Sequence, residues 1–248
     1  MADPIAALSL AMNNDMLALR SVSQNLANIS TSGYKSEVPF TTSFQNTMDR
    51  TNNVMTSSPS VFSDGGGPSI DVVRDLSQGA LQVSNNPFDL ALQGDGFFEV
   101  DTQEGTRYTR HGSLMLDGQG RLSLVSGEIL LGESGPIFLN SGSFSVDAEG
   151  VVRQNDVDLD RLRLVSFANP QSLAYMGAGL FSTGSNNALA ASEFEGQVMQ
   201  GYVEISNVNS AEEIIKLIEI TRHFETTHQV LKGYDGMLDQ AINVLGDL

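Results

Sequence analysis

The sequence predicts an α+β protein in which a helix at each end of the chain flanks a central β-rich region. Apolar residues recur every seven positions near the start of the chain and again over residues 209–247, as in paired helices. Short runs of β-forming residues lie between them, separated by Gly, Asn and Asp. We therefore expect a coiled-coil helical domain formed by residues 1–35 and 205–248, an extended connector over 36–84, and a β-domain over 85–204.

The first helix is expected over residues 4–30. Asp3 suits an N-cap, Pro4 the first helical position, and Gly33 a helix stop. Asp15 interrupts an otherwise apolar stripe of heptad spacing. That stripe consists of Ile5, Leu8, Met12, Leu19, Val22, Leu26 and Ile29.

The last helix is expected over residues 209–247, where Ser210 to Glu213 matches a capping box. Its heptad stripe has Thr227 as a weak member. The apolar members are Leu217, Ile220, Phe224, Leu231, Tyr234, Leu238 and Leu245. Because two helices alone bury little surface, we expect the terminal helices to pair with each other and to become ordered on assembly.

The β-domain is predicted from short runs with a turn signal every eight to twelve residues. The connector before it is rich in Thr, Ser, Asn and Gly, and we expect short extended pieces there at best. The predicted strands are Phe97–Val100, Arg107–Arg110, Ser113–Leu116, Leu122–Leu124, Ile137–Leu139, Phe144–Val146, Val151–Arg153 and Leu162–Phe167.

Composition excludes several function classes. The 248 residues carry a net charge of −17, concentrated between residues 36 and 204, which disfavours nucleic acid and anionic membranes as partners. The absence of cysteine excludes disulfides, thiolate metal sites and cysteine catalysis. We expect no cleavable signal peptide and no membrane span, so the protein either is cytoplasmic or leaves by a route without signal cleavage.

No arrangement of residues predicts an enzyme, a cofactor or a metal site. His223 and His228 are five apart and do not share a helix face as zinc ligands would; His111 is the third histidine. The sequence Gly94-Asp95-Gly96 is expected to be a β-turn, because a strand-like run rather than a helix follows it.

Three acids, Asp156, Asp158 and Asp160, have the spacing of a calcium loop. The loop's required Gly and Glu are replaced by Arg161 and Phe167. We favour a solvated strand edge in which Val157 and Leu159 point inward, and keep calcium binding as the minor alternative.

Three segments together resemble bacterial flagellar axial proteins, the family of rod, hook and hook-associated subunits. They are NLANISTSGYK at 25–35, NNPFDLALQGDGFFEV at 85–100 and GYVEISNVNSAEEIIKLIEITRHFE at 201–225. Within the family the chain is most similar to the proximal rod subunit, through GESGPI at 132–137 and His223-Phe224-Glu225, with the distal rod subunit next.

The resemblance implies a structural subunit whose terminal helices form the inner layer of a tube and whose β-domain forms the outer layer. Such subunits stack helically around an export channel and transmit torque across the periplasm. The implied partners are other copies, other axial proteins and the flagellar type III export apparatus, with no nucleic acid, membrane insertion or cofactor. The alternatives are a distal rod or hook-type subunit, or a secreted acidic calcium-binding or adhesive β-protein.

We expect two groups of functional residues. The residues of the two heptad stripes, without Thr227, would form the assembly interface. The resemblance also marks six signature residues as a candidate hinge: Asn25, Asn28, Gly33, Tyr34, Asn207 and Asn209.

Overall fold

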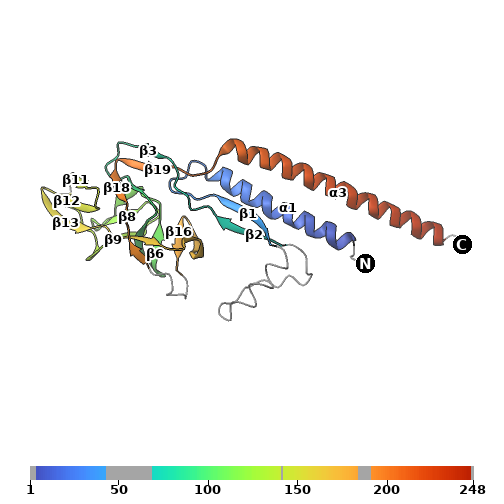
Figure 1. Ribbon diagram of the computed structural model, residues 1–248, viewed down its shortest axis with the longest axis horizontal. Helices are drawn as coiled ribbons and strands as arrows, with labels where there is room; N and C mark the ends of the chain where they lie inside the picture. The colour runs from blue at the N-terminus through green and yellow to red at the C-terminus, as the bar shows by residue number, and fades with distance from the viewer. Residues whose placement is uncertain (1–3, 43–68, 141, 184–190, 247–248) are drawn as a thin grey trace. The chain divides into compact units, whose positions relative to one another are not determined.

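The computed structural model describes residues 4–42, 69–140, 142–183 and 191–246 (Figure 1). The chain divides into two compact units, which are treated separately below. The helical unit takes its residues from 1–27, 37–73 and 209–248, and the β unit from 28–36 and 74–208. The α+β class predicted from the sequence is confirmed, with a helix at each end and a β-rich region between them.

The helical unit contains α1 (Pro4–Ala27), α3 (Ser210–Gly246) and a two-stranded ribbon of β1 (Glu37–Thr42) and β2 (Ser69–Arg74). Arg74 itself belongs to the β unit. In Figure 1 the blue helix α1 runs beside the red helix α3, and the two pack against each other. α1 ends at Ala27, three residues before the predicted end, and the chain continues in turns.

The least exposed positions of α3 recur at alternating steps of three and four residues, as a heptad face requires. They include Thr227, which is buried although its sequence signal is weak. The face consists of Glu213, Leu217, Ile220, Phe224, Thr227, Leu231 and Tyr234. This periodicity agrees with the predicted stripe, while supercoiling of the two helices remains a prediction.

In α1 the buried face is rotated by about one residue from the predicted stripe. The fully buried positions are Ala18, Ser21, Val22 and Asn25, whereas Leu19 is only half-buried. Small side chains at Ala18 and Ser21 allow close approach of neighbouring elements. α1 also contacts β1, so its buried face is shared between a helix and a strand.

The described residues of the β unit form four sheets. The ten-stranded sheet has the order β15-β16-β6-β5-β9-β8-β7, with β10 on β9 and with β14 pairing both β5 and β17. The other sheets are β11-β12-β13, β18-β4 and β19-β3. Strand bounds are β3 (Leu81–Val83), β4 (Leu90–Gln93), β5 (Phe97–Thr102), β6 (Gly105–Thr109), β7 (Leu114–Leu116), β8 (Leu122–Leu124), β9 (Ile129–Gly132), β10 (Gly135–Pro136), β11 (Phe144–Val146), β12 (Val151–Gln154), β13 (Val157–Arg161), β14 (Leu164–Phe167), β15 (Ala174–Gly177), β16 (Leu180–Ser182), β17 (Ala191–Glu193), β18 (Gln197–Gln200) and β19 (Tyr202–Glu204), with a 3-10 turn over Pro170–Ser172.

Strand β5 separates two apolar clusters. Its neighbouring residues Phe97 and Phe98 point to opposite faces because side chains alternate along a strand. Phe98 and Val100 join the larger cluster, and Phe97 packs with Phe167 and Phe181 in the smaller one. The chain bends at Gly94–Gly96 before β5, with Gly94 at φ 117°, but the Gly96 N–H donates to the Gly94 oxygen at 3.2 Å, which closes a three-residue turn and not the expected β-turn.

Two further expectations for the β region are wrong. Residues 137–139 form only an isolated bridge between Phe138 and Arg121, although Ile137 and Leu139 are buried and Phe138 is exposed as strand alternation would require. In β13, Val157 and Leu159 are exposed rather than inward. β13 lies at the edge of its sheet and shifts register against β12, which breaks the simple alternation.

Candidate functional site: two buried polar clusters

Most of the signature residues lie in or beside two hydrogen-bonded clusters, one inside each unit, whereas Asn28 lies in the turns after α1. In the helical unit the cluster forms around the amide of Asn25, which is 1% exposed. Asn25 Nδ2 donates to the backbone oxygen of Glu37 at 2.8 Å, and the Glu37 N–H donates to Asn25 Oδ1 at 2.7 Å. The side chain thus completes a backbone-like pair with the first residue of β1.

Asn25 also connects α1 to the start of α3. Its Nδ2 donates to Glu213 Oε2 at 3.0 Å, and the other Glu213 oxygen accepts from Lys216 Nζ at 2.6 Å. The predicted capping box is therefore wrong, since the Glu213 carboxylate turns inward to Asn25. Asn209 is the N-cap instead, and its Oδ1 accepts from the Ala211 N–H at 3.1 Å.

In the β unit the cluster forms around the carboxylate of Glu204, the last residue of β19. Oε1 accepts from Lys35 Nζ at 2.6 Å and from the Gly79 N–H at 2.8 Å. Oε2 accepts from Arg110 Nη1 at 3.4 Å. The side chains of Lys35, Arg110 and Glu204 are each at most 2% exposed, so this is a buried ionic cluster of two cations and one anion.

A second asparagine extends this cluster. Asn207 Oδ1 accepts from the Ser36 N–H at 2.8 Å, and Asn207 Nδ2 donates to the Asp75 oxygen at 2.9 Å. The Asp75 N–H in turn donates to the Ser36 oxygen at 2.9 Å. Three segments distant in sequence, 28–36, 74–79 and 204–208, are therefore tied together by polar contacts within the β unit.

Gly33 and Tyr34 complete the contacts of the first segment. The Gly33 N–H donates to the Glu204 backbone oxygen at 2.7 Å. Gly33 has φ +65°, and a Cβ there would lie 2.8 Å from the backbone of Arg110. Only glycine meets both conditions without strain. Tyr34 is buried, and the Arg74 guanidinium lies 5.7 Å from its ring centroid.

Burial dominates the electrostatics of the Glu204 cluster. It lowers the pKa of Lys35 below its ordinary value, while the carboxylate of Glu204 acts in the opposite direction. Burial likewise lowers the pKa of Arg110, again opposed by Glu204. The Arg110 Nε is buried with no hydrogen-bond partner in the described part of the chain. Arg110 has a second acidic neighbour, since its Nη2 lies 4.0 Å from Oδ1 of the exposed Asp95.

The residues of the two predicted heptad stripes are mostly only partly buried within the chain. All the predicted members whose side chains are described are half-buried except Val22, which is buried. Ile29 belongs to the β unit, and the side chains of Leu238 and Leu245 lie outside the description. α3 also exposes apolar residues away from the seam: Ile214, Ile215, Ile218, Val230 and Met237.

Of the remaining candidates, His223 pairs through Nδ1 with Asp15 Oδ2 at 2.7 Å, so the acid that interrupts the first stripe has a partner on α3. Asn28 accepts from the Thr31 hydroxyl at 3.2 Å in the turns after α1. Asp158 pairs with Arg153, and Asp160 accepts from Ser134. Within the described residues no three His, Asp or Glu side chains are grouped as a metal site.

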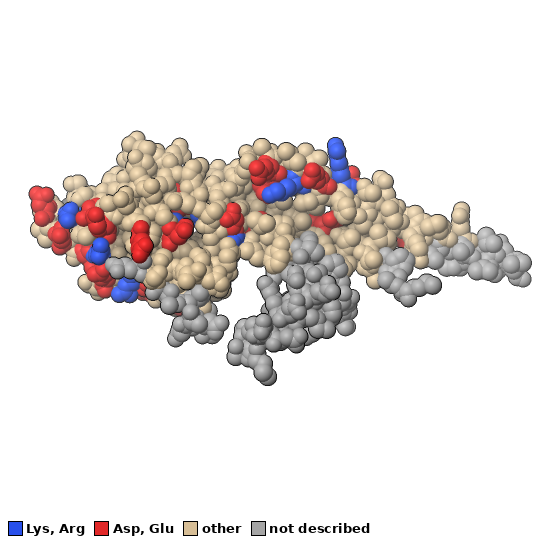
Figure 2. Space-filling model, in the orientation of Figure 1, with Lys and Arg blue, Asp and Glu red and all other residues tan. Residues whose placement is uncertain are grey.

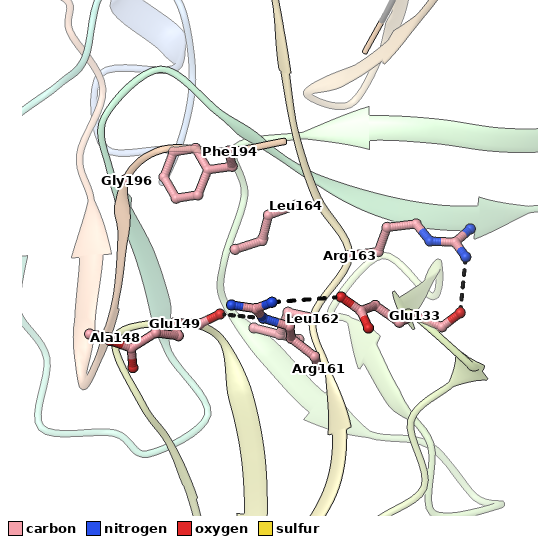
Figure 3. A pocket seen from close by; sticks show the side chains of 9 residues that line it. All are labelled: Glu133, Ala148, Glu149, Arg161, Leu162, Arg163, Leu164, Phe194 and Gly196. Carbon is pink, nitrogen blue, oxygen red and sulfur yellow. Dashed lines mark hydrogen bonds and ion pairs between the residues drawn. The ribbon is translucent and has the colours of Figure 1, made fainter. Parts of the chain in front are cut away.

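One open pocket of the β unit has a volume of about 270 Å³ and is shown in Figure 3. Its wall includes Arg161, the last residue of β13, and Arg163, which lies just before β14. Arg161 Nε donates to the Glu149 oxygen, and Arg163 Nη2 donates to the Glu133 oxygen, each at 3.0 Å. The two guanidinium groups hydrogen-bond to neighbouring turns, so their role in the wall of the pocket is to hold those turns in place.

The described residues on the face drawn in Figure 2 show no patch of a single charge. In Figure 2 red acidic side chains are scattered over the visible face, with blue basic side chains between them. In the described ranges no helix is both long and apolar enough to cross a membrane.

The sequence indicated the asparagines and Gly33 but not the charged members of the β-unit cluster. Lys35 stood inside the quoted signature, yet its partner Glu204 is 169 positions away. Arg110 carried no local signal either. An isolated acid in the apolar run GYVEIS was the available hint, since a charged residue in a strand core requires a partner.

Comparison with known proteins assigns the family. A model described as the flagellar basal body rod FlgEFG protein C-terminal region matches residues 199–244. A model of the flagellar hook protein FlgE/F/G D1 domain matches residues 91–154. Both matches coincide with segments whose resemblance is visible in the sequence.

Relatives that match over most of their length indicate the same family. The rod protein FlgG of Buchnera aphidicola subsp. Schizaphis graminum is 32% identical over 88% of this chain and 90% of its own length. The rod protein FlgF of Caulobacter vibrioides is 30% identical over 92% and 91%. FlgF of Rhizobium meliloti is 34% identical over 68% and 71%. The chain belongs to the family of flagellar basal-body rod proteins, which are structural subunits, and FlgG and FlgF resemble it to a similar degree.

Proposed function

We propose that the chain is a rod subunit of the proximal type that assembles helically with copies of itself and with other axial proteins. The assembled rod would cross the periplasm, enclose the export channel and transmit torque from motor to hook. Export would use the flagellar type III apparatus without signal cleavage. A distal rod or hook-type subunit is the alternative within the family.

One observation carries the assembly proposal: each terminal helix has more apolar surface than its partner in the same chain covers. α3 uses one face for α1 and leaves Ile214, Ile215 and Ile218 about half exposed. α1 likewise leaves Leu19 half-buried and Met16 exposed. Apolar surface in excess of the fold marks protein interfaces, and the simplest partner is another axial subunit with the same helices.

Ile218→Asp tests the assembly proposal without disturbing the seam inside the chain. The purified variant should keep the helix content and unfolding midpoint of the parent, yet fail to restore motility or enter basal bodies. Leu231→Asp, in the seam itself, should also abolish assembly while the β unit stays folded. Gln229→Asp adds the same charge at an exposed polar position and should be tolerated. Normal motility with Ile218→Asp and Leu231→Asp would contradict the helical interface.

The proximal assignment is supported by the segments 132–137 and 223–225, which resemble that subunit. The first of these spans the tight β9–β10 hairpin. Complementation of strains lacking either FlgF or FlgG tests the assignment. Rescue of the FlgF-deficient strain alone is expected, and rescue of the FlgG-deficient strain alone would show a distal subunit.

A further inference from the structure

We propose that residues 28–36, here called the strap, dock on the β unit as a separable piece held chiefly by the ammonium group of Lys35. The strap can then leave its site while the strands of the β unit remain folded. The inference concerns the isolated chain and does not depend on the rod assignment.

The strap is attached by polar contacts and not by the apolar core. Neither apolar cluster of the β unit contains a strap residue. Tyr34 is the one strap residue that buries a large apolar side chain completely. The strongest attachment is Lys35 Nζ, which lies 2.6 Å from both Glu204 Oε1 and the Ser77 oxygen.

Docking of the strap costs free energy at two polar groups, which lose their contact with water. The Ser32 hydroxyl is buried without a hydrogen-bond partner in the described part of the chain. Lys35 loses its hydration, which is why burial lowers its pKa despite the nearby carboxylate. Both groups recover water when the strap leaves, so docking is finely balanced compared with the burial of an apolar strand.

The remainder of the cluster stays balanced without the strap. Glu204 keeps Arg110 Nη1 at 3.4 Å and the Gly79 N–H at 2.8 Å, which leaves one guanidinium facing one carboxylate. Asn207 Nδ2 still reaches the Ser77 oxygen, at 3.3 Å, that Lys35 releases. Loss of the strap therefore leaves no unpaired charge in the β unit.

The position of the strap in the sequence suggests what its release could do. It follows α1 directly and precedes β1 directly, so both of its ends continue into the helical unit. Release would provide a joint that allows the helical elements to become ordered in a step separate from the folding of the β core.

Hydrogen exchange followed by mass spectrometry on the full chain tests the proposal. Lys35→Met removes the ammonium group at similar side-chain volume, and Gly33→Ala pushes the strap from the Arg110 backbone by a steric route. Because Lys35→Met removes the strongest polar contact of the strap and Gly33→Ala adds a steric clash, exchange of amides 32–36 should rise roughly a hundredfold in each variant. Amides of β5 and β8 should stay within about threefold of the parent.

Lys232→Met makes the same substitution at an exposed position of α3 and should leave strap exchange unchanged. Two results would overturn the inference. One is unchanged exchange of the strap in Lys35→Met; the other is an equal rise in the strap and in β5, because the strap would then be an inseparable part of the core.

Discussion

Replacing Asn25 by Asp should turn the attractive contact between Asn25 on α1 and Glu213 at the start of α3 into a repulsive one. The substitution keeps the size of the side chain and its acceptor for the Glu37 N–H. It replaces the donor Nδ2 by an oxygen that lies 2.8 Å from the Glu37 oxygen and 3.0 Å from Glu213 Oε2. A buried hydrogen bond thereby becomes a close contact between two carboxylates.

The magnitude follows from these distances. At 3.0 Å two unit charges repel by about 5 kcal/mol at an effective dielectric constant of about 20. Lys216, 2.6 Å from the other Glu213 oxygen, offsets part of the repulsion, whereas the lost hydrogen bonds add to it. We expect the free energy of unfolding of the helical unit to fall by about 3–5 kcal/mol at pH 7.

Urea unfolding followed by circular dichroism at pH 7.0 and pH 4.5 measures the effect. The pKa of the introduced carboxyl group should lie above its usual range, because a proton shared with Glu213 relieves the repulsion. The folded state then binds more protons than the unfolded state, so the deficit shrinks as the pH falls. Asn28→Asp is the matched control, since its oxygen still accepts from Thr31 and it should cost under about 0.5 kcal/mol. A deficit at pH 7 equal to that control, or one that does not shrink on acidification, would refute the reasoning.

Two further predictions concern the β unit. Gly79→Ala should lower its stability by about 3 kcal/mol or more, because the added Cβ would lie 2.0 Å from the backbone oxygen of Ile205, which cannot rotate away. A change in the urea midpoint no larger than that of Gly118→Ala, where an added Cβ meets nothing within 4 Å, would contradict this expectation. Burial lowers the pKa of His111 below its ordinary value. The unfolded state therefore takes up the proton first, and the associated stability is present above about pH 6.5 and is lost as the pH falls through the folded pKa. His111→Gln should reduce the fall in unfolding midpoint between pH 7.0 and pH 5.5, and an unchanged slope would exclude His111 as its source.

The helical pattern was largely predictable because heptad spacing is a local property of the sequence. The stripe on α3 coincides with its least exposed face and even includes Thr227 at a heptad position. On α1 the buried face is offset by about one residue from the predicted stripe. A single helix pattern does not show how a face is divided between two neighbours, and α1 contacts both α3 and β1.

The polar clusters were predictable only in part. The asparagines and Gly33 were singled out through the resemblance, but their partners follow from no local rule. Glu213 looked like part of a capping box, and only the fold brings it to Asn25 across 188 positions. The inward direction expected for Val157 and Leu159 failed because β13 lies at a sheet edge with a register shift.

The sequence by itself determined the α+β class, the two terminal helices, the position of the turn at Gly94–Gly96 and the family, since spacing, turn residues and signature segments are all contiguous in the chain. The tertiary structure alone decided which charges are buried and with whom. Lys35 pairs with Glu204 because two segments far apart in the chain meet in the interior of the β unit. A buried charge there requires a partner.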